Sequence, residues 1–242
     1  MNRVLTSGAV TASALCLTLS ADAGMISATY LGAGASQFQQ AGYNNNLAWD
    51  STGSVNMYNL RMSEHRWDVG GKVAYTWCVQ MFQGLTGGTN YEFELVEAEM
   101  VPQAPPAPGP MGVTKANLMR DAMARWLDAD SRVIASAGSA NAAAAAFSAL
   151  VWEISHENLG TTDIDTALMR MSLSTGAFRS NLTGEAATIY GKMIASLGKG
   201  GWLWTDAEGW QSPSAQDQIR LVPGPGALAL LAIAGARGRR RR

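Results

Sequence analysis

Hydrophobic and polar positions follow two different periods along this chain. From residue 28 to about residue 101, short apolar runs alternate with Gly, Asn and Thr, and three of these runs predict strands, over residues 54–60, 72–81 and 90–97. The third is the clearest, because Tyr91, Phe93 and Leu95 alternate with Glu92 and Glu94 and so leave one face to water. The first half therefore reads as antiparallel β structure.

After a segment with five prolines between residues 102 and 110, which predicts an extended loop, the period changes to that of helices. Thr114 is a candidate N-cap for a helix over 115–127, and further helices are predicted over 140–156 and 183–197. Their inward positions are expected to be Leu118, Met119, Ala122 and Trp126 in the first helix, Phe147, Leu150, Val151 and Ile154 in the second, and Ile189, Met193 and Ile194 in the third. Strands followed by helices favour an α+β fold. We expect a single domain with an N-terminal antiparallel β part, sandwich or barrel-like, and a helical C-terminal half.

The first 23 residues have the three parts of a secretory signal peptide. Arg3 gives a positive start, an apolar run extends over residues 4–19, and Ala21 and Ala23 form an A-x-A cleavage site. Cys16 lies in the apolar run and would leave with it. The alternative interpretation is a buried N-terminal helix.

The other end of the chain also carries a recognisable pattern. Val222, Pro223, Gly224 and Pro225 precede an apolar run over 226–236, and the chain closes on an arginine run that includes Arg239, Arg240, Arg241 and Arg242. As a helix the apolar run would reach roughly 16 Å, which is short against a hydrocarbon core of about 30 Å. The alternative is an ordinary tail whose basic patch binds nucleic acid.

This arrangement of residues 221–242 resembles the PEP-CTERM sorting signal of bacterial exported proteins. The resemblance implies recognition by a membrane peptidase of the exosortase type and transient membrane anchorage through residues 226–236. It further implies delivery to the cell surface, the outer envelope or the extracellular matrix. Residues 24–220 are then left as one domain, long enough to bury a core.

Charge and cysteine content limit what that domain can do. Residues 24–236 hold 12 Lys and Arg against 18 Asp and Glu, a net charge of −6, which argues against nucleic acid as a partner. Without Cys16 a single cysteine, Cys78, is left, so no intramolecular disulfide is expected. His65 and His156 are the two histidines, and neither CxxC nor HExxH occurs, so we predict no metal and no cofactor.

Two short stretches resemble the bacterial thioester domain. They are Trp77-Cys-Val79 and Ala146-Phe-Ser-Ala-Leu-Val-Trp-Glu-Ile154. In that family a strand cysteine condenses with a helix glutamine, ammonia is lost, and the internal thioester then captures an amine or hydroxyl on a target surface. The resemblance implies that Cys78 and residue 148 are the paired positions, flanked by Trp77 and Trp152.

Residue 148 is serine here, however, and a serine side chain has no carbonyl with which to acylate Cys78. We therefore expect an inactive thioester site in an exported protein that serves adhesion, binding or matrix assembly through an unidentified ligand, with no catalytic residue. Another glutamine could reach Cys78 in space, and the composition offers Gln37, Gln39, Gln40 and Gln103. The alternative function is an exported hydrolase that uses Cys78 with His65 or His156.

Overall fold

The computed structural model describes residues 24–222. The signal-peptide residues 1–23, with Ala21 and Ala23, lie outside the described range, as do Pro223, Gly224 and Pro225, the apolar run 226–236 and Arg239 to Arg242. Of the helices in the described range, none combines the length and the hydropathy that crossing a bilayer requires.

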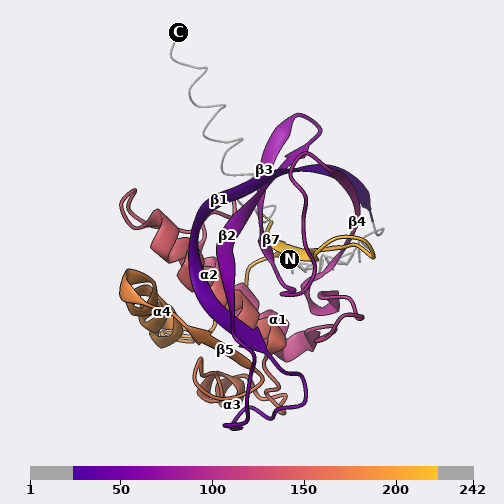
Figure 1. Cartoon of the computed structure of the whole chain (residues 1–242). Coiled ribbons are helices and arrows are strands. Elements are labelled where there is room, and N and C mark those ends of the chain that lie inside the picture. Colours follow the sequence, from indigo (N-terminus) through magenta and orange to yellow (C-terminus); the bar gives the residue numbers. More distant parts are fainter. Residues whose placement is uncertain (1–23, 223–242) are drawn as a thin grey trace, which may run out of the picture.

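The predicted α+β class is confirmed (Figure 1). Along the chain the elements are β1 (Met25–Tyr43), β2 (Tyr58–Val69), β3 (Lys72–Cys78), β4 (Asn90–Glu97), the short 3₁₀ helix η1 (Ala98–Met100), α1 (Gly112–Trp126), α2 (Ala140–His156), α3 (Ile164–Met169), β5 (Phe178–Asn181), α4 (Gly184–Ser196), β6 (Ala207–Gln211) and β7 (Gln218–Leu221).

Six of the strands close into an antiparallel barrel. The hydrogen-bonded order is β2-β3-β7-β6-β4-β1-β5, and β1 also pairs with β2, which closes the ring and leaves β5 as an extra strand. Strand β1 can do this because it is 19 residues long and bends, with register shifts between Tyr30 and Gly32 and between Ala33 and Ser36. Gly32 lies at a φ of +100°, a conformation that glycine adopts at little cost. Figure 1 shows the resulting curve of β1 around the barrel.

Of the three predicted strands, the third is correct at both ends, as β4, and the second is β3, which stops at Cys78 rather than at residue 81. The first was placed too early, since β2 begins at Tyr58 and continues to Val69. Strands β1, β5, β6 and β7 were not predicted. In β2 the polar residues Ser63, Glu64 and His65 are buried, so hydrophobic alternation does not mark the strand.

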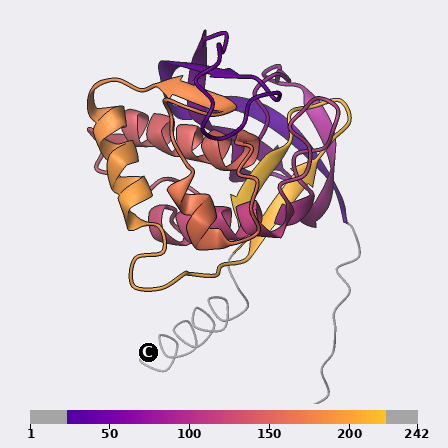
Figure 2. The same cartoon turned by 90° about the horizontal axis from the view of Figure 1, so that it is seen from below.

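Helix α2 has the predicted bounds and is the central helix of the domain. It contacts β1, β2, β3, β5 and α4, and every residue from Ala142 to His156 is buried. Its alanine run allows close approach to the barrel wall, and Phe147 packs against Trp77 of β3 with ring centroids 4.6 Å apart. The helices gather along one side of the barrel (Figure 2). A second cluster, built around Trp67, Phe93 and Trp210, fills the barrel itself.

The expectation that Thr114 caps α1 is wrong. The helix begins two residues earlier, at Gly112, and the Thr114 hydroxyl donates instead to the Thr162 carbonyl at 3.1 Å. In α4, Thr183 does occupy the N-cap, although its side chain makes no capping hydrogen bond. Met193 is fully buried, and Ile189 and Ile194 pack against the core from partly buried positions.

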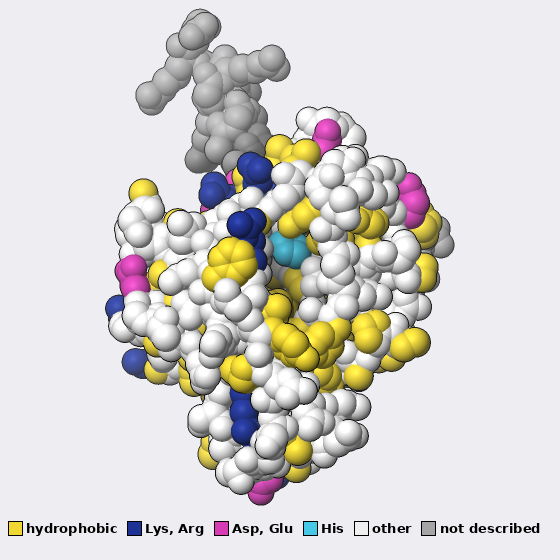
Figure 3. All heavy atoms as spheres, in the orientation of Figure 1, with side chains coloured by type: hydrophobic (Ala, Val, Ile, Leu, Met, Phe, Trp, Pro, Cys, Tyr) yellow, Lys and Arg dark blue, Asp and Glu magenta, His cyan; other side chains and the backbone are white. Residues whose placement is uncertain are grey.

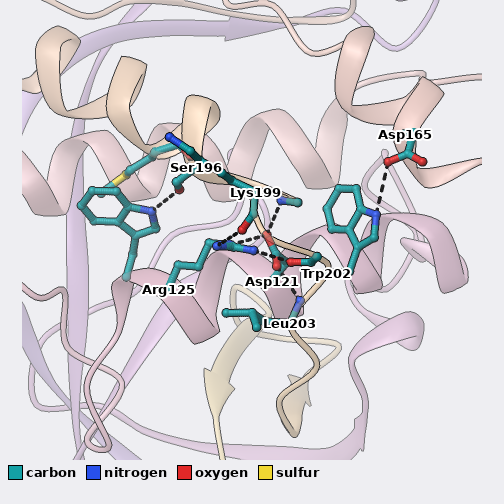
Figure 4. A network of polar contacts seen from close by, with 11 residues as sticks. Asp121, Arg125, Asp165, Ser196, Lys199, Trp202 and Leu203 are labelled. Atoms are coloured by element: carbon teal, nitrogen blue, oxygen red, sulfur yellow. Dashed lines mark hydrogen bonds and ion pairs between the residues drawn. The ribbon is translucent and has the colours of Figure 1, made fainter.

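A buried carboxylate ties α1 to the loop that follows α4 (Figure 4). Asp121 accepts hydrogen bonds from Arg125 Nε at 2.8 Å, from the Gly198 amide at 3.0 Å and from the Leu203 amide at 2.7 Å. The Arg125 guanidinium continues to the carbonyls of Lys199 and Gly201. This loop leads into β6, so the network fixes where the last hairpin of the barrel begins.

Candidate functional site at Cys78

Cys78 is the last residue of β3, where the strand passes under α2. The strand pairs with β7 at this point, and Cys78 lies opposite Gln218. One residue later, the Val79 amide donates to the Asp217 carbonyl at 3.0 Å, which fixes the backbone immediately after the strand ends. The thiol is free, and the residue is 6% exposed.

The thiol lines a cavity of about 100 Å³ that strands, helix and loops enclose together. A water occupies about 30 Å³ in the liquid, so the space suits a few waters or one small group. Figure 3 shows a hollow on this face with a histidine side chain in it, and His65, at 8% exposure, is the histidine that is not fully buried. The lining residues are Leu60, Arg61, Ser63, His65, Cys78, Met81, Ser148, Trp152 and Gln216.

Three of the four positions that the thioester resemblance singled out therefore surround one cavity. Cys78 comes from β3, and Ser148 and Trp152 come from successive turns of α2. Trp77 does not join them: its ring packs on Phe147, and its Nε1 donates to the Ser131 carbonyl at 2.9 Å. The Ser148 hydroxyl donates to the Ser63 carbonyl of β2 at 3.3 Å, which is a structural contact.

The structure brings two glutamines to Cys78 that sequence reasoning missed, Gln218 opposite it on β7 and Gln216, of which only Gln216 lines the cavity. Gln216 lines the cavity, its Nε2 donates to the Gln80 carbonyl, and the Cys78 thiol donates to the same carbonyl at 2.5 Å. Two atoms that share one acceptor at ordinary hydrogen-bond distances are at most about 6 Å apart. A carboxamide thus lies beside the thiol even though residue 148 is serine.

The other glutamines considered from sequence are held elsewhere. Gln39 accepts hydrogen bonds from the Thr183 amide and hydroxyl, and Gln40 accepts one from Asn181. Gln103 lines a different pocket, beside Gln211 and Ser212, and only its backbone carbonyl contacts Gln80. Gln37 is not among the residues that line the cavity. Only knowledge of the β3–β7 pairing would have pointed to Gln216.

Burial determines the charge state of the Cys78 thiol. It raises the pKa of the Cys78 thiol well above its ordinary value, and nearby Asp217 adds to the effect, while contacts with the Gln80 backbone and the Trp152 indole oppose it. The Trp152 Nε1 is buried and makes no hydrogen bond of ordinary geometry within the described residues. The cavity therefore holds a neutral thiol.

His65 is the second titratable group in the cavity. Burial lowers its pKa to about 4, partly offset by the hydrogen bond to Gln218, so the ring is neutral at pH 7. Its Nδ1 lies 3.0 Å from Gln218 Oε1, and since a carbonyl oxygen only accepts, Nδ1 carries the proton and Nε2 is unprotonated. His156 does not line this cavity. It packs against Tyr43, and burial lowers its pKa to about 3.

This geometry gives little support to a cysteine hydrolase. Such an enzyme needs a thiolate activated by an imidazole within hydrogen-bond reach. Here the Cys78 thiol is bonded to a carbonyl and its pKa is raised. Within residues 24–222, no three or more His, Cys, Asp and Glu side chains gather closely enough to hold a metal ion.

Comparisons of the chain with protein-family models, with curated proteins and with solved structures found no match.

Proposed function

We propose that this chain is an exported adhesion or matrix-binding protein that engages its ligand on the face containing the Cys78 cavity. The observation that carries the proposal is the convergence of Cys78, Ser148 and Trp152 on one small cavity at the end of β3 and α2. The end segments support export and sorting, with an exosortase-type peptidase as the partner of residues 221–242. Val222 is the one residue of the sorting motif in the described range, and its amide donates to the Asp206 carbonyl at 2.9 Å.

Any contact between the ligand and residue 148 is proposed to be non-covalent. A serine hydroxyl has no acyl carbon to offer, and here it is directed to the Ser63 carbonyl. Cys78 would then contribute as a small apolar side chain in the wall of the cavity.

A second candidate, covalent capture, is favoured by the position of Gln216. In this reaction the Cys78 sulfur attacks the Gln216 carboxamide carbon, a carbon–sulfur bond forms, the carbon–nitrogen bond breaks, and ammonia leaves with the thiol proton. His65, with its unprotonated Nε2, is the base that lines the same cavity, although the raised pKa of the Cys78 thiol opposes this attack as it opposes hydrolase chemistry. A ligand amine or hydroxyl would then attack the carbonyl and release the thiol.

Intact mass separates the two candidates. The full chain is expressed, weighed, and treated with a thiol-specific maleimide after denaturation, and the peptide containing Cys78 is mapped. The unmodified mass with Cys78 labelled means that no thioester forms, which excludes covalent capture. A mass short by one ammonia, with Cys78 blocked until an amine is supplied, means covalent capture.

Gln216→Glu is the decisive variant for the covalent candidate, because a carboxylate does not condense with a thiol under these conditions. Gln83→Glu is the matched control, since Gln83 lies outside the cavity. Loss of the mass defect in the first variant alone assigns the acyl group to residue 216. Equal behaviour of the two variants removes Gln216 from the mechanism.

The export and surface location that the adhesion proposal requires are tested on cells. We expect antibody against residues 24–220 to label intact cells of an exosortase-containing host, and deletion of residues 221–242 to release the protein into the medium. A chain that stays inside the cell in both forms would refute the proposal.

A further inference from the structure

One surface pocket adjoins the Cys78 cavity, and a second pocket adjoins the first through Phe82. The nearer one, of about 450 Å³, is also lined by Leu60 and Met81, which belong to the cavity wall as well. The farther one, of about 510 Å³, lies between Phe82 and the loop that follows β1. We call the two pockets together the Phe82 groove. Hydrophobic side chains gather beside the hollow that holds the histidine (Figure 3).

Exposed aromatic rings form the floor of this groove. Phe82 is 51% exposed and Tyr58 is 49% exposed, which is unusual for rings of this size. The centroid of Phe82 lies 6.2 Å from that of Tyr43 and 6.4 Å from that of Tyr58. Phe82 is tilted by 33° from Tyr43 and meets Tyr58 edge to face at 84°, so the three rings form one aromatic cluster rather than three isolated side chains.

Uncharged amides surround the aromatic cluster. Asn44, Asn45 and Asn56 line the farther pocket, and Asn45 Oδ1 accepts from the Tyr43 hydroxyl at 2.5 Å. The side chain of Asn56 is exposed and makes no hydrogen bond to the described residues. In the nearer pocket Gln83 Oε1 is buried without a partner among them. Each amide offers both donors and an acceptor.

The groove also lacks charge. Among the described residues that line the two pockets there is no Asp, Glu, Lys or Arg. An acidic or basic polymer would find no counter-charge here and would have to give up its own hydration, which is costly. The lining selects for a ligand that is polar, hydrogen-bonding and neutral.

We propose that the Phe82 groove binds a neutral polysaccharide. The apolar C–H face of a sugar ring can stack on the exposed ring of Phe82 or of Tyr58, and its hydroxyls both donate to and accept from the asparagine amides. Two adjoining pockets suit several consecutive sugar units. The inference rests on the proposed adhesion function and names its ligand class.

A proline-rich peptide is the other ligand that aromatic grooves accept. Proline has no N–H, so its residues cannot donate to the exposed Asn56 amide oxygen, which makes no hydrogen bond to the described residues. Sugar hydroxyls can donate to it and can also accept from its N–H groups. The ligand chemistry also agrees with the covalent candidate, because a hydroxyl-bearing chain in this groove ends beside Cys78.

Calorimetric titration of the purified full chain tests the inference. The neutral probes are cellohexaose, xylohexaose, mannohexaose and maltohexaose, and the contrasting probes are hexagalacturonic acid and a proline-rich decapeptide. We expect a neutral hexasaccharide to bind and the contrasting probes not to. Phe82→Ala should weaken that binding at least tenfold, and Asn56→Ala several-fold.

Phe38→Ala is the matched control, since Phe38 is 55% exposed on β1 and lies outside the groove. We expect it to bind as the unaltered chain does, and thermal melts should show all three variants folded. Binding by none of the neutral probes, preference for either contrasting probe, or equal weakening by Phe82→Ala and Phe38→Ala would each overturn the proposal. Surface labelling of cells is independent of these titrations, so failure of the groove and failure of the adhesion function are distinguishable.

Discussion

Replacing Asp121 by alanine tests the polar network that positions the last hairpin. The carboxylate is fully buried on α1 and accepts three hydrogen bonds, one from Arg125 and two from the amides of Gly198 and Leu203 (Figure 4). Asp121→Ala removes all three acceptor contacts at once. Two backbone N–H groups and a guanidinium are left facing an apolar side chain.

The expected loss of stability follows from these contacts. A buried donor left without a partner costs about 1–3 kcal/mol, and breaking a buried ion pair costs about 3–5 kcal/mol. The costs do not add fully, because Arg125 retains its bonds to Lys199 and Gly201 and its side chain reaches water. We expect Asp121→Ala to lower the free energy of unfolding by about 3–5 kcal/mol. Asp121→Asn keeps one acceptor oxygen and should cost about half as much.

Urea unfolding followed by tryptophan fluorescence measures the loss. Asp68→Ala is the control, since Asp68 accepts a single hydrogen bond, from the Gly71 amide at 2.7 Å, in an exposed turn. That change should cost about 1 kcal/mol or less. For a domain of this size 1 kcal/mol shifts the melting temperature by about 2–4 °C, so the two variants should melt well apart. Equal losses for Asp121→Ala and Asp68→Ala would refute the reasoning.

Three further predictions concern groups near the site. Burial raises the pKa of Asp217 from 3.8 to about 6, so the native state binds this proton more tightly than the unfolded state and stability is lost as pH rises. Between pH 4 and pH 7 the chain should lose about 3 kcal/mol relative to Asp217→Asn, measured by urea unfolding. A pH-independent difference would contradict this. Burial lowers the pKa of His65 to about 4, so its contribution is present above pH 6.5 and lost as pH falls. Between pH 6.5 and pH 4 the free energy of unfolding should therefore fall by about 3 kcal/mol less in His65→Asn than in the unaltered chain. An equal fall in the two chains would contradict this. A Cβ on Gly42 would lie 2.1 Å from the Asn56 carbonyl, whereas one on Gly87 meets nothing within 4 Å. In thermal melts, Gly42→Ala should lower the free energy of unfolding by about 1–3 kcal/mol, and Gly87→Ala should change it by no more than about 0.5 kcal/mol. Equal losses in the two variants would contradict the close approach of Gly42 to the Asn56 carbonyl.

The three long helices were predictable because their burial is one-sided or complete over many residues, whereas the six-residue α3 is too short to show a period and was not predicted. The run from Ala140 to His156 is long, apolar and free of glycine and proline, so α2 was placed with correct ends. Strand β4 alternates cleanly because one of its faces meets water. Strand β1 escaped notice because it contains Gly32, Gly34 and Gly42 and bends twice. Its central residues, from Gly32 to Gln37, are all of intermediate exposure, so no period of two emerges over that stretch.

Gln216 shows why half of the site could be predicted and half could not. Cys78, Ser148 and Trp152 belong to two continuous elements, so local pattern and a family resemblance were enough to connect them. Gln216 reaches the cavity only because β7 pairs with β3 across the closed barrel, and no periodicity in one sequence records which strands are neighbours.

The placement of Gln216 is also fixed independently of its own side chain. The Asp217 carboxylate accepts from the amides of Ser212 at 2.8 Å and Gln103 at 2.5 Å, and the Asp217 amide donates to Gln80 Oε1 at 2.9 Å. These bonds hold the backbone of the β6–β7 connection against the end of β3. The side chain of residue 216, whatever its type, therefore lies beside the Cys78 thiol. The reactions available to Cys78 depend on that side chain as much as on the side chain of residue 148.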